Sequence, residues 1–154
     1  MDTDFDFFFG RWTVQHRRLK ARLAGCDEWD RFGGTSHVRP LLGGHGNIDD
    51  NVIEALAGTY RAATLRAWSA SSRTWSIWWL DGRYADHVDA PMVGRFDGAV
   101  GSFHADELFD GRPIRVRFLW DRSKPEHPRW EQAFSTDGGA SWETNWEMVF
   151  SRQP

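Results

Sequence analysis

Residues 130–150 read WEQAFSTDGGASWETNWEMVF, and this stretch decides the fold. Two alternating runs flank the turn residues Asp137-Gly138-Gly139. In residues 142–150 a large or apolar side chain occupies most second positions, while acidic and amide groups fill several positions between them. A period of two is typical of a half-buried strand, and glycines supply the positive φ angles of a tight turn. The stretch therefore predicts an antiparallel hairpin.

A three-residue turn at 137–139 also predicts a register for this hairpin. It sets Phe134 opposite Trp142, Gln132 opposite Thr144, and Trp130 opposite Trp146. Met148 and Phe150 continue the same face. The face then combines stacked aromatic rings with two adjacent polar groups, where a filled core favours Val or Leu. We therefore expect aromatic residues to line a hollow interior.

The same pattern of strand and turn recurs along the whole chain. Turn residues such as Ala57-Gly58, Asp97-Gly98 and Asp110-Gly111 separate strand-length runs at 11–23, 28–41, 47–56, 59–69, 74–80, 92–97, 99–109, 113–122, 129–136 and 141–151. About ten strands with almost no helical periodicity predict an all-β protein. Closing such a meander into an up-and-down antiparallel barrel removes its exposed edges. We expect one barrel domain over residues 1–154.

The sequence of the hairpin at 59–80 does not decide which of its two faces points inward. A two-residue turn at Ser71-Ser72 puts Ala63, Leu65, Ala67, Trp78 and Leu80 on one face, and Tyr60, Ala62, Thr64, Arg66, Trp68, Trp75, Ile77, Trp79 and Asp81 on the other. Either face could point inward. We choose the second, because its bulk suits a cavity wall.

Composition excludes several classes of function. The chain has 10 Trp and 11 Phe, so aromatic burial supplies much of its core. A net charge of −3 argues against nucleic acid as the main partner. The start at Met1-Asp2-Thr3-Asp4 lacks the basic region of a signal peptide, no apolar run is long enough for a bilayer, and Cys26 stands alone. These features predict a cytoplasmic protein with no membrane partner.

The N-terminal segment Phe5-Asp6-Phe7-Phe8-Phe9-Gly10-Arg11-Trp12 resembles the Gly-x-Trp signature of lipocalins and other calycins. It is most similar to a family of small bacterial calycin-like proteins of unknown function, which share motifs such as Gly58-Thr59-Tyr60-Arg61 and Arg73-Thr74-Trp75-Ser76-Ile77. The resemblance implies a barrel with a short N-terminal helix that plugs one end, where Trp12 packs. It assigns no activity, because a fold alone does not fix one.

Several motifs favour structural interpretations. The run 135–142 matches a single Asp-box, which propellers repeat, so we expect a hairpin turn in which Asp137 accepts local backbone N–H groups. None of the six histidines has the spacing of a metal-ligand pair, and we predict no metal and no cofactor. The basic run at 17–22 alternates like a strand and favours a solvated face.

Three residues are candidates for proton transfer or charge stabilisation. His16 shares the parity of Trp12 and Val14, but the apolar residues at 19, 21 and 23 have the opposite parity, which predicts a bulge near residue 17. His16 is then either the last inward residue or exposed, and exposure is favoured. Arg66 and Glu54 are candidates for the interior, although charged strand residues usually point outward. An inward Arg66 needs an acid partner or the carboxylate of a ligand, and Asp81 or Glu54 could supply the countercharge.

Three functions are compatible with this pattern. The leading hypothesis is binding of a small, largely apolar or aromatic metabolite in the barrel, with ligand-binding residues Tyr60, Arg66, Trp68, Trp79, Phe118, Trp120, Trp130, Gln132, Phe134, Thr144 and Trp146 and a further wall residue, Trp142. The alternative is a cyclase, isomerase or hydrolase acting on a hydrophobic intermediate in the same cavity, with His16, Glu54 or Arg66 as catalytic groups. The third is an interaction module or homodimer that docks through outward aromatics such as Trp78.

Overall fold

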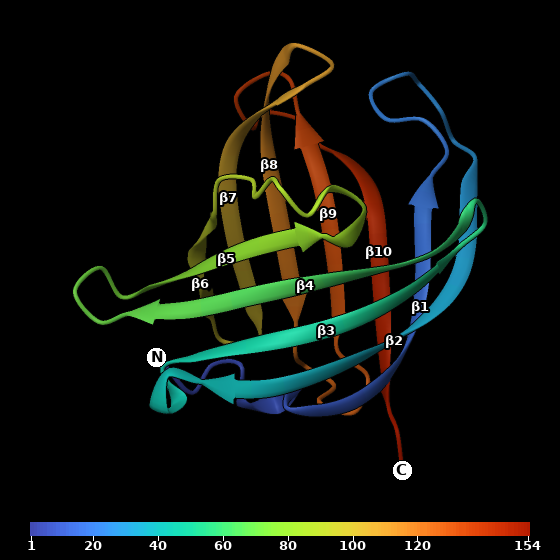
Figure 1. The fold of residues 1–154 in the computed structure, drawn as a ribbon. Helices are drawn as coiled ribbons and strands as arrows, with labels where there is room; N and C mark the ends of the chain where they lie inside the picture. The colour runs from blue at the N-terminus through green and yellow to red at the C-terminus, as the bar shows by residue number, and fades with distance from the viewer.

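The computed structural model describes residues 1–154 and shows one closed, antiparallel barrel of ten strands (Figure 1). The strands are β1 (Gly10–Leu19), β2 (Trp29–Leu41), β3 (Gly46–Ala55), β4 (Gly58–Ser69), β5 (Thr74–Asp81), β6 (Met92–Asp97), β7 (Val100–Phe109), β8 (Arg112–Asp121), β9 (Arg129–Ser135) and β10 (Glu143–Arg152). Each strand pairs with its neighbours in sequence, and β1 closes the barrel against β10. The predicted all-β, up-and-down barrel is confirmed.

The only helical elements are three 3-10 turns: η1 (Asp6–Phe8), η2 (Leu42–Gly44) and η3 (Gly82–Tyr84). The expected N-terminal helix is therefore the single turn η1. Gly10, with a φ of 120°, leads the chain into β1 before an α-helix can form. No helix in the structure has the length and apolar character needed to span a bilayer.

Aromatic packing around η1 closes one end of the barrel, called here the closed end. The Phe8 ring lies 4.8 Å from Trp120 and 4.9 Å from Phe150, measured between ring centroids. The indole N–H of Trp12 donates to the carbonyl of Phe8 at 2.8 Å. Arg152 donates to the carbonyls of Phe7 and Phe9, and its guanidinium lies 4.2 Å from the Trp12 ring centroid. The Gly-x-Trp segment thus acts as a plug.

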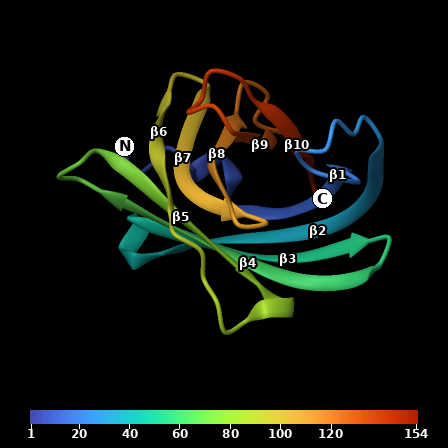
Figure 2. The ribbon, with the colours of Figure 1, turned by 90° about the horizontal axis from the view of Figure 1, so that it is seen from above.

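The barrel is formed by two groups of strands that cross at a steep angle. β2–β5 run across one side, and β7–β10 stand behind them (Figures 1 and 2). In the β4–β5 hairpin, Trp68 pairs with Trp75, as the two-residue turn predicts. Ala62 and Arg66 are buried, whereas Leu65 is 38% exposed, so the face chosen as inward does face inward.

The predicted register of the β9–β10 hairpin is wrong. A β-bulge at Asn145 pairs Gln132 with Trp146, and Thr144 with Ala133. Asn145 is fully buried, and the 2.8 Å hydrogen bond that its side-chain oxygen accepts from Gln132 supports the bulge. The extra residue reverses the faces before it, so Thr144 and Trp142 lie on the outer surface. There the Trp142 ring lies 4.4 Å from the guanidinium of Arg117.

The predicted bulge in β1 is also absent. β1 pairs without interruption from Trp12 to Arg18 with β2 and with β10. His16 and Arg18 therefore share the inward face, which corrects both the favoured exposure of His16 and the solvated face expected for residues 17–22. The apolar residues 21 and 23 misled the assignment because they belong to the loop after Leu19, where strand parity does not apply.

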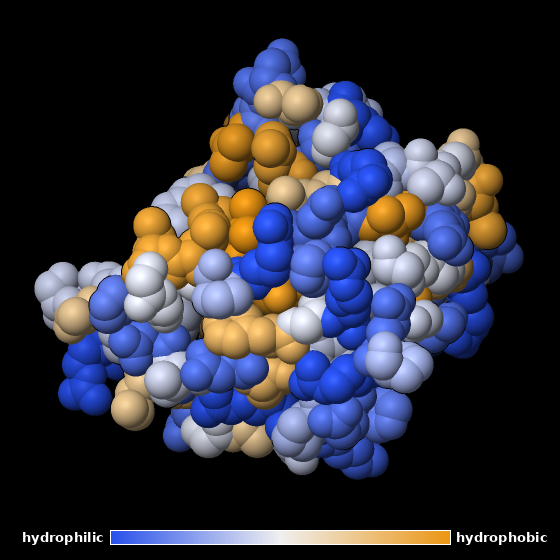
Figure 3. Space-filling model, turned by 60° about the horizontal axis from the view of Figure 1, so that its bottom comes forward, coloured by the Kyte–Doolittle hydropathy of each residue, from blue (hydrophilic) through white to orange (hydrophobic).

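The outer surface mixes apolar and hydrophilic side chains. Figure 3 shows apolar patches, in orange, among hydrophilic residues, in blue. Leu65 on β4 and Val93 on β6 are exposed, and Trp78 on β5 is half-buried on this outer side. A homodimer that uses these residues stays a prediction.

Candidate functional site: an aromatic cavity in the barrel

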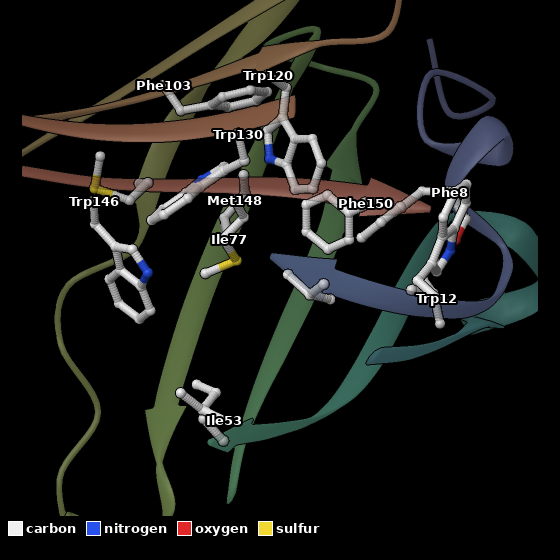
Figure 4. Close-up of a cluster of buried hydrophobic side chains, with 14 of the residues drawn as sticks. Phe8, Trp12, Ile53, Ile77, Phe103, Trp120, Trp130, Trp146, Met148 and Phe150 are labelled. Carbon is white, nitrogen blue, oxygen red and sulfur yellow. The ribbon is translucent and has the colours of Figure 1, made fainter. Parts of the chain in front are cut away.

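A cavity of about 100 Å³ lies inside the barrel between the plug and the opposite, open end. Of its 19 lining residues, 12 are hydrophobic, and β8, β9 and β10 supply the largest share. Figure 4 shows Trp120, Trp130 and Trp146 among them. Seven of the residues predicted to bind ligand line it: Arg66, Trp79, Phe118, Trp120, Trp130, Gln132 and Trp146. The hollow predicted beside Gln132 and Thr144 is present beside Gln132, but Thr144 does not line it.

The tryptophans of the wall meet edge to face. Trp130 lies 5.0 Å from Phe118 and 5.4 Å from Trp146, and Trp146 lies 5.8 Å from Trp79. These ring pairs are nearly perpendicular, a favourable arrangement for aromatic pairs. Trp120 differs, because it stacks on Phe150 with ring centroids 5.5 Å apart. The cavity lies among these edge-to-face and stacked rings.

Four other residues predicted to bind ligand do not line the cavity. Tyr60 is buried and its hydroxyl accepts a 3.1 Å hydrogen bond from Arg18. Trp68 packs 5.7 Å from Trp75, and Phe134 packs 5.4 Å from Phe109. Thr144 is on the outer surface because of the Asn145 bulge. Bulk and parity alone do not distinguish cavity walls from packed ends of the barrel.

A buried ion pair forms one side of the cavity. Arg66 and Asp49 are each 3% exposed, and their nearest nitrogen and oxygen lie 2.7 Å apart. Arg66 also donates to Asn47 at 2.8 Å, while Asp49 accepts from the backbone N–H of Thr64 at 2.8 Å and from Asn51. The inward position of Arg66 agrees with the sequence hypothesis, but its partner is Asp49 instead of Asp81 or Glu54.

Sequence reasoning missed Asp49, although a signal existed. Asn47, Asp49 and Asn51 share the parity of the buried Ile53, and the hairpin register places Asn47 opposite Arg66. Acidic residues on the other face of β3, Asp50 and Glu54, hid this alternation. Glu54 itself is exposed, so the structure does not support it as an interior group.

Several donors at the cavity have no protein partner. The Nε group of Arg66 is buried without a hydrogen bond. Three indole N–H groups bond to protein, those of Trp12, Trp75 and Trp146. Those of Trp120 and Trp130, which both line the cavity, do not. Because buried donors are usually satisfied, these groups are suited to a ligand that carries acceptor atoms.

Glu107 and Asp89 bring two further carboxyl groups to the cavity at its open end. Burial raises the pKa of Glu107 above its ordinary value, and the negative charge of Asp89 adds to the rise. Asp89 is also 2.8 Å from His87. Residues 99–109 show no clean alternation in the sequence, yet Glu107 shares the parity of the buried Phe103. An inward carboxyl group with a raised pKa is a candidate for proton transfer.

His16 lies behind the cavity wall. Its Nδ1 accepts a 3.1 Å hydrogen bond from the indole N–H of Trp146, and its ring stacks on Phe32 at 4.8 Å. Burial, together with the positive charge of Arg18, lowers the pKa of His16 to about 4. The imidazole is therefore neutral near pH 7, and His16 fixes the position of Trp146.

The remaining motifs have structural roles. Asp137 accepts hydrogen bonds from Ser135 and from the hydroxyl and backbone N–H of Ser141. These bonds lower the pKa of Asp137 to about 2, and the expected hairpin turn is confirmed. No three His, Cys, Asp or Glu side chains lie together in an arrangement that could hold a metal ion.

The fold is similar to that of a solved lyase. An S-type phycobiliprotein lyase from Guillardia theta superposes with a TM-score of 0.67, covering 97% of this chain and 90% of the lyase at 9% sequence identity. At that identity the likeness supports the barrel fold alone. No protein-family model matches the chain. No curated protein sequence matches it.

Proposed function

We propose that the protein binds a small, largely apolar or aromatic molecule in the barrel cavity. The observation that carries the proposal is a largely apolar cavity whose lining includes donors without a protein partner: the buried Nε of Arg66 and the indole N–H groups of Trp120 and Trp130. Apolar burial contributes about 25 cal/mol per Å² to binding, and the donors would orient a ligand that carries acceptor atoms. With this proposal we keep two expectations, membership of the small bacterial calycin-like family and a cytoplasmic location.

Titration of intrinsic tryptophan fluorescence tests this function. Methyl 1-naphthylacetate is a suitable uncharged aromatic probe, because its ester oxygens can accept hydrogen bonds. We expect saturable quenching and a rise in melting temperature. Trp130→Ala should weaken binding about tenfold, since it removes one wall. Trp78→Ala, on the outer side of β5, is the matched control and should leave the affinity unchanged. The absence of saturable quenching and of a melting shift in the wild type would overturn the proposal.

A second candidate function is catalysis in the same cavity, and Glu107 is the observation that favours it. This carboxyl group lines the cavity and has a raised pKa, as a general acid or base near neutral pH requires. Of the three residues first considered, only Arg66 lines the cavity, and Asp49 holds its charge. The fold neighbour is itself named a lyase, so a barrel of this kind is compatible with an enzyme.

Deuterium exchange separates catalysis from binding. Mass spectrometry of molecules that copurify with the protein would first identify the ligand. We then expect an isomerase or cyclase to incorporate solvent deuterium into that ligand. Glu107→Gln should abolish the exchange and preserve binding. Exchange that persists in this variant would remove Glu107 from the chemistry.

A further inference from the structure

The open end of the barrel carries a cluster of arginines that the cavity does not explain. Arg18 closes the inward face of β1, Arg22 lies in the loop that follows, and Arg83 belongs to η3. Arg18 donates to the Tyr60 hydroxyl at 3.1 Å, and the guanidinium of Arg83 lies 3.7 Å from the Tyr60 ring centroid. Three chain segments therefore bring positive charge to one tyrosine.

Arg18 also connects this cluster to the cavity. Its guanidinium lies 5.1 Å from the ring centroid of Trp146 and 5.0 Å from that of Phe32. Trp146 lines the cavity, so the arginine cluster begins next to a cavity residue, although none of the three arginines lines the cavity itself. Arg22 lies 5.5 Å from the ring of Phe134, whose strand, β9, also supplies the cavity residue Trp130.

Two of the three guanidiniums make no direct ion pair, although Asp81 lies near enough to Arg18, and Glu143 to Arg22, for their charges to interact. Arg83 forms a two-bond ion pair with Asp81, but neither Arg18 nor Arg22 forms an ion pair, although both are half-buried. Asp30 is the cross-strand partner of Arg18 and still makes no ion pair with it. Glu143 is the acid whose charge acts on Arg22, but its carboxylate accepts a 2.7 Å hydrogen bond from the backbone N–H of Leu23 instead of forming an ion pair.

The local electrostatics agree with a shortage of negative charge. Burial lowers the pKa of Arg22, and the charge of Arg18 lowers it further. Arg18 has the same effect on His16. Partly buried like charges without direct ion pairs are unfavourable, and an anion between them would relieve the repulsion. Glu107 and Asp89 also line the cavity, so a bound carboxylate is expected on the side of the arginines, away from these two acids.

We propose that Arg18 and Arg22, supported by the field of Arg83, bind the carboxylate of a ligand whose apolar body occupies the cavity. This inference rests on the proposed function and narrows the ligand class to aromatic or apolar carboxylic acids. Guanidinium groups suit the role because their planar forks match a carboxylate.

A matched pair of probes tests the inference. 1-Naphthylacetic acid and its methyl ester share one aromatic body and differ in charge. We expect the acid to bind about ten times more tightly than the ester, since a hydrogen bond to a charged group is worth about 1.5–3 kcal/mol. The preference should shrink as sodium chloride is added, because the site is partly open to water.

Variants locate the effect. Arg18→Gln and Arg22→Gln should each weaken binding of the acid about tenfold and leave that of the ester unchanged. Arg39→Gln, on an exposed position of β2, is the control. Equal binding of acid and ester by the wild type would overturn the anion site and leave the proposed function standing. Failure of both probes to bind would instead overturn the proposed function. Melting temperatures check that each variant is folded.

Discussion

The two ends of the barrel differ in the kinds of side chain that fill them. At the closed end, Phe5 and Phe8 pack within an aromatic cluster, and the indole N–H groups of Trp12 and Trp75 donate to Phe8 and Asp4. At the open end, Arg18 and Arg22 are half-buried without direct ion pairs, and Glu107 has a raised pKa. Aromatic packing dominates the closed end, whereas the open end carries charged groups that make no ion pair and that a ligand could satisfy.

This difference indicates that the closed end contributes mainly to stability and the open end mainly to binding. Groups that pack or pair fully add to the free energy of unfolding. Groups left half-buried and unpaired reduce it, and proteins retain such groups where function needs them. The cavity lies between the two ends, and both aromatic and polar side chains line it.

The largest effect should come from the closed end. Phe8→Ala removes a ring that contacts Trp120 and Phe150 and leaves a space beside them. We expect a loss of about 3–5 kcal/mol in the free energy of unfolding, measured by urea denaturation. Leu108→Ala, at a position 71% exposed in β7, is the control and should cost less than about 0.5 kcal/mol. A loss below about 1 kcal/mol for Phe8→Ala would show that the plug does not hold the barrel together.

A smaller effect should appear at His16, between the two ends. Its pKa falls from 6.5 to about 4 on folding, so the unfolded chain binds a proton that the folded protein excludes between these pH values. The contribution of neutral His16 to the free energy of unfolding is thus complete above pH 6.5, and about 3 kcal/mol of it is lost as the pH falls to 4.

Urea denaturation at several pH values, compared with His16→Gln, measures this contribution. The Gln side chain offers an oxygen to the indole N–H of Trp146 but does not titrate in this range. The variant should therefore lose less stability than the wild type on acidification. Identical pH dependence in the two proteins would show that His16 is accessible to protons in the folded state.

Sequence patterns predicted the fold well because turn chemistry and alternation repeat along the chain. The β4–β5 hairpin is an example, since Ser71-Ser72 set its register and bulk identified its inward face. The β9–β10 hairpin failed, because a bulge at Asn145 depends on a tertiary contact with Gln132 that alternation does not show. Likewise, Arg66 could be named but Asp49 could not, since the choice between acids on β3 required the register of β3 against β4.

The smallest change in the free energy of unfolding should come from replacing Glu107. This replacement should stabilise the protein, whereas Phe8→Ala at the closed end should destabilise it. Burial raises the pKa of this carboxyl group, so the folded protein binds its proton more tightly than the unfolded chain does. The contribution of protonated Glu107 to the free energy of unfolding is then complete below the ordinary pKa of 4.5, and it is lost as the pH rises through the raised pKa. Glu107→Gln keeps the shape and removes the charge, and it should stabilise the protein at pH 7 but not at pH 4.

The neighbouring Asp106→Asn is the matched control, because Asp106 is exposed on the same strand and its side chain points to the other face. Urea denaturation of both variants at pH 4 and pH 7 gives the comparison. A destabilised Glu107→Gln at pH 7 would mean that the carboxylate has a structural role, and the contrast between the ends would fail. A stabilised variant would mean that the wild type keeps a charge at the cavity despite its cost, as expected of a group that acts on a ligand.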